Sequence, residues 1–262
     1  MSEQLVSQNS GSKREKKPAK KRFSAALEFS HQLPYDPLFA ERVPLLEAFR
    51  LALSHYQIAQ HANKPRGLKQ TLKGWFSPQR DRFNVAECGV FNGNSLLAIG
   101  RMAREAGVPF FMHGLDTFEG LPDLSQIDSE MAPENAPYRN KRVFTETSVE
   151  LVSKKMSDAG LSESVKLIKG LFSSTLDMLP EQRYHFVNID CDLYEPHLEC
   201  LEYFYKKMAR GGILFFDDYN SVEYPMAKRA VDEFMADKEE KILSLCYGDD
   251  AANRTKAFVI KF

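Results

Sequence analysis

FVNIDCDLY at residues 186–194 and GGILFFDDY at residues 211–219 are the two stretches that decide the fold of this chain. Each is an apolar run of strand length that closes on acidic residues. The segment between them is long enough for one helix, so the unit predicts a strand, a helix and a second strand parallel to the first. An α/β fold with a largely parallel sheet is therefore expected.

The acidic residues at these two strand ends are Asp190, Asp192, Asp217 and Asp218. In an open α/β sheet the carboxyl ends of neighbouring strands share one crevice, where ligands bind. We expect the four carboxylates to converge there, and such a group needs protonation or a bound cation to offset its repulsion. An all-oxygen, anionic site suits Mg²⁺ better than zinc. The alternative is that these are ordinary solvated acids, because Asp is common in turns.

The composition indicates one α/β domain with a full core, since 43% of the 262 residues are hydrophobic. The net charge of −1 hides an asymmetry, because residues 1–22 carry seven Lys or Arg against two Glu. This basic stretch could contact nucleic acid or a membrane surface, but a flexible, solubilising tail is the simpler interpretation. The acidic remainder argues against nucleic acid as the main partner.

No apolar run in the sequence reaches the length of a membrane span, and the first residues lack the apolar core of a secretory signal. The cysteines show no paired metal-ligand spacing, and buried, reduced thiols are expected. The six histidines are scattered, which argues against a zinc site. We therefore predict no membrane association and a reducing, cytoplasmic setting.

The hydrophobic pattern predicts a helical segment at residues 34–62, followed by alternating strands and helices. Residues 118–142 contain three prolines and show no clear period, so this long loop is a candidate lid. The last two strands should form a hairpin that adds an antiparallel strand to an otherwise parallel sheet. The predicted strands cover residues 83–88, 110–115, 165–169, 184–190, 213–217, 242–246 and 256–262.

A glycine-containing turn, ECGVFNGNS at residues 87–95, follows the first of these strands and lacks the second glycine of a dinucleotide fingerprint. Gly89 and Gly93 let the backbone approach a ligand, and Glu87 can accept hydrogen bonds from an amine. Asp116 ends the next strand, where its two oxygens suit the two hydroxyls of a ribose. Acids here are awkward for the diphosphate of NAD and favourable for the ammonium of S-adenosylmethionine. A purely structural glycine turn is the alternative.

With these motifs in view, the chain resembles the macrocin-type O-methyltransferases, which methylate sugar hydroxyls on antibiotics. The resemblance covers residues 83–262 and implies a seven-stranded, Rossmann-like methyltransferase sheet, mostly parallel with an antiparallel last strand. The motifs that carry it, in family order, lie at residues 87–95, 116–122 (DTFEGLP), 170–172 (GLF), 190–194 (DCDLY) and 211–219.

The resemblance also implies roles for individual residues. S-adenosylmethionine would be the methyl donor, and Mg²⁺ would be held by carboxylates matching Asp190, Asp217 and Asp218. Asp192 matches the general base. Tyr194 and Tyr219 could wall the acceptor site or simply pack against the sheet edge. The residues expected to bind the donor are Glu87, Gly89, Gly93, Ser95, Asp116, Gly170, Phe172 and Asp190.

Together these inferences divide the chain into a basic tail at 1–22, a helical cover at 23–82 and a methyltransferase domain at 83–262 with a lid at 118–142. The expected function is metal-dependent methyl transfer to a hydroxyl of a sugar-bearing or polyhydroxylated small molecule, as in natural-product biosynthesis. The acceptor itself and self-association stay open.

Three alternatives are weighed against this function. A catechol or phenol O-methyltransferase shares the cofactor and the metal and differs only in its acceptor. A metal-dependent glycosyltransferase also uses a D-x-D motif but leaves the glycine turn unexplained. A non-catalytic binding module should have lost some of the acids, and all of the expected ones are present.

Overall fold

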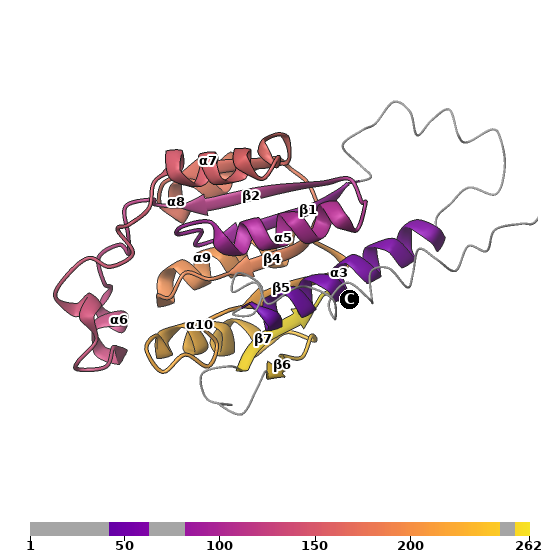
Figure 1. Ribbon diagram of the computed structural model, residues 1–262. Coiled ribbons are helices and arrows are strands. Elements are labelled where there is room, and N and C mark those ends of the chain that lie inside the picture. The colour runs from indigo at the N-terminus through magenta and orange to yellow at the C-terminus, as the bar shows by residue number, and fades with distance from the viewer. Residues whose placement is uncertain (1–41, 63–81, 247–254) are drawn as a thin grey trace, which may run out of the picture. The chain divides into compact units, whose positions relative to one another are not determined.

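Seven strands pair into one mixed sheet (Figure 1). The structure, a computed structural model, describes residues 42–62, 82–246 and 255–262. The strands lie in the order β3-β2-β1-β4-β5-β7-β6. They are β1 (Phe83–Cys88), β2 (Phe110–Asp116), β3 (Val165–Lys169), β4 (Tyr184–Ile189), β5 (Met208–Phe216), β6 (Leu243–Cys246) and β7 (Thr255–Ile260).

The pairing of the strands confirms the predicted fold class. Strands β1 to β5 are parallel to one another, whereas β7 runs antiparallel to both β5 and β6. From β1 the chain moves outward to β2 and β3, and it then returns to place β4 on the other side of β1. The carboxyl ends of β1 and β4 therefore flank the point where the strand order reverses, which is where open α/β sheets bind ligands.

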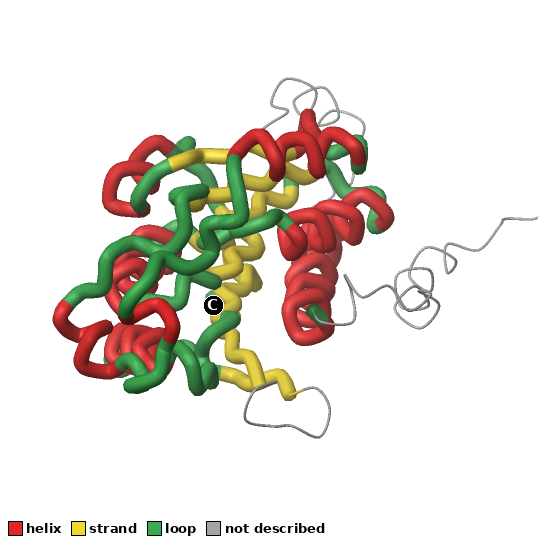
Figure 2. The backbone as a smooth tube through the Cα atoms, turned by 60° about the vertical axis from the view of Figure 1, so that its left-hand side comes forward, coloured by secondary structure: helices red, strands yellow, loops and turns green. Residues whose placement is uncertain are grey.

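Helices cover both faces of the sheet (Figure 2). Side chains along each strand alternate between the two cores: Phe186 and Phe215 face one, and Val187 and Phe216 face the other. The first face is covered by α3 (Val43–Ala62), α5 (Asn94–Glu105) and α7 (Val149–Asp158), and the second by α8 (Phe172–Thr175), α9 (Tyr194–Tyr205) and α10 (Pro225–Met235).

Burial along β1 and α5 explains why the turn between them is held firmly. All six residues of β1 are buried, as expected of a central parallel strand. Helix α5 turns Leu96 and Ile99 into the first core, where each is fully buried. Burying a side chain of this size contributes about 1.5–3 kcal/mol, so the ends of both elements are fixed where the turn begins.

The predicted lid contains regular structure that its sequence pattern did not indicate. Helix α6 (Gln126–Met131) and the 3₁₀ turn η2 (Pro137–Arg139) lie within residues 118–142. Helix α6 is only six residues long and starts at a reciprocal capping pair formed by Ser125 and Asp128. Such a short helix gives no periodic signal, but the S-x-x-D spacing is a capping signature that could have revealed it.

Smaller differences concern element ends and short turns. Strand β5 begins at Met208, five residues before the predicted start, because Met208 already pairs with Tyr184 of β4. Helix α9 begins at Tyr194, which still places Pro196 in the first turn, where its missing N–H costs no hydrogen bond. Helix α8 and the 3₁₀ turns η3 (Ser162–Ser164) and η4 (Leu176–Met178) were not predicted.

Some predictions fall outside the described residues. These are the basic tail at 1–22, the parts of the helical cover at 23–41 and 63–81, and the tip of the last hairpin at 247–254. Helix α3 is the described part of the predicted cover, and it packs against β4 and β5. Among the described helices, none is both long and apolar enough to cross a bilayer.

Candidate active site

The turn after β1 passes directly over the end of β4. Gly89 has a φ angle of +89°, and its N–H donates to the carbonyl oxygen of Leu115 at 2.9 Å. A Cβ atom at this position would lie 1.6 Å from the carbonyl oxygen of Asp190. Only glycine allows both the left-handed conformation and this approach, so the residue is required by the backbone itself.

The carboxylate of Asp116 organises this glycine turn. One oxygen accepts the backbone N–H groups of Val90 at 2.7 Å and Phe91 at 2.8 Å. The other accepts the N–H of Phe118 at 2.6 Å. Phe91 and Phe118 both have positive φ angles, of 46° and 52°, and the carboxylate supports both of these unfavourable conformations. Asp116 thus joins the ends of β1 and β2.

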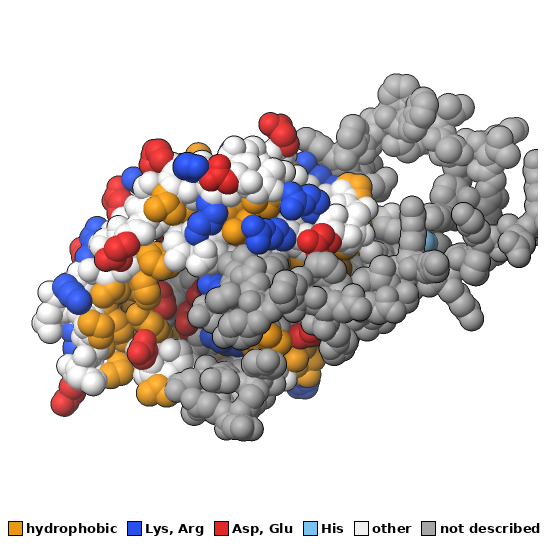
Figure 3. Space-filling model, in the orientation of Figure 1, with side chains coloured by type: hydrophobic (Ala, Val, Ile, Leu, Met, Phe, Trp, Pro, Cys, Tyr) orange, Lys and Arg blue, Asp and Glu red, His pale blue; other side chains and the backbone are white. Residues whose placement is uncertain are grey.

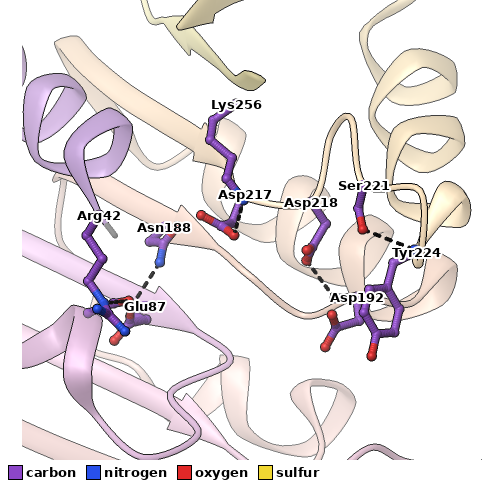
Figure 4. Close-up of polar contacts among 10 residues, drawn as sticks. Arg42, Glu87, Asn188, Asp192, Asp217, Asp218, Ser221, Tyr224 and Lys256 are labelled. Atoms are coloured by element: carbon purple, nitrogen blue, oxygen red, sulfur yellow. Dashed lines mark hydrogen bonds and ion pairs between the residues drawn. The ribbon is translucent and has the colours of Figure 1, made fainter. Parts of the chain in front are cut away.

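Glu87 lies buried behind the turn, between β1 and β4 (Figure 4). One of its carboxylate oxygens accepts a hydrogen bond from the Asn188 side chain at 2.9 Å, and the other has no hydrogen-bond partner among the described residues. Burial raises the pKa of Glu87 to about 8, although Asn188 and the nearby Arg42 oppose the shift. Arg42 also donates to the Ser95 hydroxyl at 3.1 Å, so it lies beside the start of α5.

The three predicted metal ligands come together at the ends of β4 and β5. Asp190, Asp217 and Asp218 each offer a carboxylate oxygen, and these oxygens lie within 4.8 Å of one another. Burial and the carboxylate of Asp217 raise the pKa of Asp218 to about 7. Burial also raises the pKa of Asp190 well above its usual range, and the repulsion of Asp217 and Asp218 adds to the shift. The cluster therefore holds its negative charge at an energetic cost.

Lys256 of β7 offsets part of that charge. Its ammonium lies 2.6 Å from a carboxylate oxygen of Asp217. Figure 4 draws this contact between the two side chains. Burial alone would lower the pKa of Lys256, but the attraction of Asp217 and then Asp218 outweighs burial and raises it. The lysine is therefore held in its charged form against the acid cluster.

Asp192 lies at a tight turn between β4 and α9, with a φ angle of +63°. The N–H of Leu193 donates to the carbonyl of Cys191 at 2.6 Å, which closes a three-residue turn centred on Asp192. A turn of this kind with positive φ is rare and strained. The N–H of Asp192 donates to Asp218 at 3.2 Å, and loss of solvation followed by repulsion from Asp218 and Asp217 raises the pKa of Asp192 well above its usual range.

A lid residue completes this turn. The N–H of Tyr194, the first residue of α9, donates to the carboxylate of Asp128 at 2.8 Å. Leu193, which precedes the helix, provides no side-chain cap of its own. Asp128 is 1% exposed, and its other oxygen accepts from the Ser125 hydroxyl at 2.7 Å. Helix α6, within the predicted lid, therefore caps α9 through a residue outside that helix.

A cavity of about 1220 Å³ joins the glycine turn to the start of α9. Figure 3 shows acidic side chains, in red, that lie deeper than the neighbouring hydrophobic patch, in orange, on the face in view. The predicted site residues that line the cavity are Gly89, Ser95, Asp116, Gly170, Phe172, Asp190 and Asp192, whereas Glu87, Gly93, Asp217 and Asp218 lie outside its lining. Gly93 instead faces α7, where an added Cβ would lie 2.7 Å from the Val152 side chain.

Sequence reasoning missed Arg42, Asp128 and Lys256. Arg42 and Lys256 are far from the motifs, and only the tertiary fold brings them to the site. The two tyrosines that could have walled the acceptor site, Tyr194 and Tyr219, donate from their hydroxyls to acidic side chains of α10. Neither tyrosine is among the residues that line the cavity.

Comparison with known proteins gives similar O-methyltransferases. Demethyldecarbamoylnovobiocin O-methyltransferase of Streptomyces niveus is 28% identical over 154 residues, which are 58% of this chain and 58% of that protein. The 8-demethyl-8-(2,3-dimethoxy-alpha-L-rhamnosyl)-tetracenomycin-C 4'-O-methyltransferase of Streptomyces olivaceus is 28% identical over 144 residues, 52% of each chain. The chain thus spans little more than half the length of these relatives.

The solved structure of the O-methyltransferase NovP matches this fold with a TM-score of 0.58 and 25% identity, over 68% of this chain and 72% of that one. The family model for macrocin O-methyltransferase (TylF) matches residues 82–243, which hold both the glycine turn and the acid cluster. Because that match covers more than half of the sequence, the chain belongs to the macrocin O-methyltransferase (TylF) family.

Proposed function

We propose that this protein transfers a methyl group from S-adenosylmethionine to a hydroxyl of a sugar-bearing small molecule. One observation carries the proposal: the glycine turn of the family-matched segment and Asp192 line the same cavity of about 1220 Å³. Pockets for one small molecule usually measure about 300–1,000 Å³. The cavity therefore offers space for a donor and an acceptor together.

The donor end of the cavity is assigned to the ends of β1, β2 and β3. Gly89 lets backbone approach a ligand, and Asp116 holds the turn and also faces the cavity. Arg42 lines the cavity beside the start of α5, and Glu87 lies buried behind the turn near it, so a guanidinium and a carboxyl are available for the zwitterionic end of an amino acid. When bound, S-adenosylmethionine supplies an electrophilic methyl group on a sulfonium.

The acid cluster fits a divalent cation. Asp190, Asp217 and Asp218 provide hard oxygen donors close together, and the raised pKa values of Asp190 and Asp218 indicate carboxylates that need positive charge. A Mg²⁺ ion held by these residues would polarise the acceptor hydroxyl and lower its pKa. Asp190 also lines the cavity, so the cluster borders the proposed acceptor end.

Asp192 is the proposed general base. A sugar hydroxyl is a weak nucleophile near neutral pH, so its proton has to be removed as the methyl group is transferred. Asp192 is not one of the three clustered acids, and it lines the cavity. Its raised pKa brings its basicity nearer to neutral pH, where general-base catalysis is most effective.

The acceptor class is proposed from the relatives. One of them is named for a rhamnosyl-bearing acceptor, and the family takes its name from macrocin. A phenolic acceptor is the competing possibility, and only a direct comparison of acceptors separates the two classes.

The test is an assay of methyl transfer in which mass spectrometry detects the methylated product. The protein is given S-adenosylmethionine and each member of a panel of glycosylated polyketides and catechols, once with Mg²⁺ and once with EDTA. We expect methylated products from the sugar-bearing acceptors only when Mg²⁺ is present and not in EDTA.

Asp192→Asn should lower the methylation rate by about 10²–10⁴ with donor affinity retained, which is the loss expected when a general base is removed. Glu163→Gln, which changes an exposed acid of η3, serves as the control. Full activity in EDTA would refute the metal assignment, and near-normal turnover of Asp192→Asn would exclude the base.

A further inference from the structure

The ion pair between Lys256 and Asp217 is fixed by the register of the reversed strand. Phe216 of β5 pairs with Ala257 of β7, and the two strands are antiparallel. The next position along the ladder therefore sets Asp217 opposite Lys256, where the ammonium and the carboxylate meet at 2.6 Å. About a quarter of each side chain is exposed, 24% for the lysine and 27% for the aspartate, so the pair is only partly open to solvent. Partial burial strengthens their attraction.

Lys256 lies in a part of the chain that the family model does not reach. That match ends at residue 243, whereas Lys256 lies beyond it, on β7. The three clustered acids all lie within the matched segment, so the counter-charge at Asp217 comes from outside it.

We propose that Lys256 is a built-in counter-cation that competes with the divalent ion for Asp217 and so sets the affinity of the metal site. The inference rests on the proposed function, in which Asp190, Asp217 and Asp218 hold Mg²⁺. Without metal, the ammonium offsets the repulsion among these carboxylates and lets the site fold. When a divalent cation binds, the same ammonium repels it and already occupies one oxygen of Asp217. The metal is therefore bound more weakly than three free carboxylates would allow.

The test is isothermal titration of the full chain with MgCl₂, and separately with MnCl₂, at fixed pH and salt and without donor or acceptor. Lys256→Met keeps the length of the side chain and removes its charge, and it should bind either ion roughly tenfold more tightly, the order expected when one positive charge near a divalent site is removed. Lys256→Arg keeps the charge and should bind like the wild type. The matched control is Lys261→Met, just after the end of β7, because Lys261 pairs with Glu240. It should leave metal affinity unchanged.

Thermal unfolding gives a second measurement. In EDTA, Lys256→Met should unfold at a lower temperature than the wild type, and added Mg²⁺ should raise its midpoint by more, because tighter binding to the native state stabilises it more. If Lys256→Met does not fold in EDTA but folds in Mg²⁺, the proposal is supported. If it folds in neither, Lys256→Gln, which can still donate to Asp217, replaces it in both measurements.

The outcomes separate this inference from the proposed function. If the wild type binds metal and Lys256→Met binds it equally or more weakly, the counter-cation role is overturned and the metal site stands. If neither protein binds Mg²⁺ or Mn²⁺, the metal assignment fails and this inference fails with it.

Discussion

Gly89 lies where the turn after β1 meets the backbone of Asp190, and the contact leaves no room for a side chain. Gly89→Ala would force the new Cβ into the carbonyl oxygen of Asp190 while keeping a φ angle of +89°. We expect the free energy of unfolding, measured in urea, to fall by at least about 3 kcal/mol, because overpacking and backbone strain act together.

Gly107 is the matched control, since its φ angle is +66° and an added Cβ would meet no atom within 4 Å. Gly107→Ala should cost only the strain of the left-handed conformation, about 1–2 kcal/mol. Equal losses for the two variants would show that the contact with Asp190 is unimportant.

Some of the individual site residues could be predicted from the sequence and others could not. The meeting of Asp190, Asp217 and Asp218 follows from their positions after two parallel strands, which end at one edge of the sheet. The contact of Lys256 with Asp217 depends on the register of an antiparallel hairpin, and register is not encoded in the motif. The burial of Glu87 could not be predicted from the sequence either, because the alternation of side chains along a strand does not show which face of the sheet is closed to solvent.

At the scale of elements, the apolar runs of the sequence predicted the strands closely. The structure found within the lid at 118–142 was not predicted by the hydrophobic pattern. Strands β1 and β3 have the predicted ends because each run is bounded by polar or turn residues. Helix α6 is too short to be stable alone, and its docking onto α9 through Asp128 holds it in place. A contact between distant segments of this kind leaves no local pattern.

The lid and α9 should therefore open together when Asp128 is changed. Asp128→Ala removes the acceptor for the Tyr194 N–H and also the capping pair with Ser125. We expect exchange of the backbone amides of residues 192–195 to speed up by about fivefold or more, because losing a helix cap costs about 1 kcal/mol. Exchange is measured by mass spectrometry on the full chain. Glu130→Gln, on the exposed side of the same helix, is the control, and unchanged exchange in Asp128→Ala would show that the lid does not support α9.

At the scale of the whole molecule, the two cores on either side of the sheet bury ionisable groups as well as apolar ones. His113 of β2 is 2% exposed, and its Nδ1 atom has no hydrogen-bond partner among the described residues. Burial lowers the pKa of His113 to about 4, and the positive charges of Arg82 and Lys166 add to the shift. His113 therefore stays neutral in the folded protein at pH values where the same histidine in the unfolded chain is protonated, since its ordinary pKa is about 6.5.

The sign of the resulting pH dependence follows from this difference. Between about pH 6.5 and pH 4 the unfolded chain binds a proton at His113 and the folded protein does not, so acid favours unfolding. The stabilisation is fully present above pH 6.5 and is lost as the pH falls toward 4, by up to about 3 kcal/mol for a shift of this size. His113→Gln removes this titration, so its free energy of unfolding in urea should fall less than that of the wild type between pH 7 and pH 5. If both proteins lose stability equally over that range, His113 is not a source of the acid sensitivity.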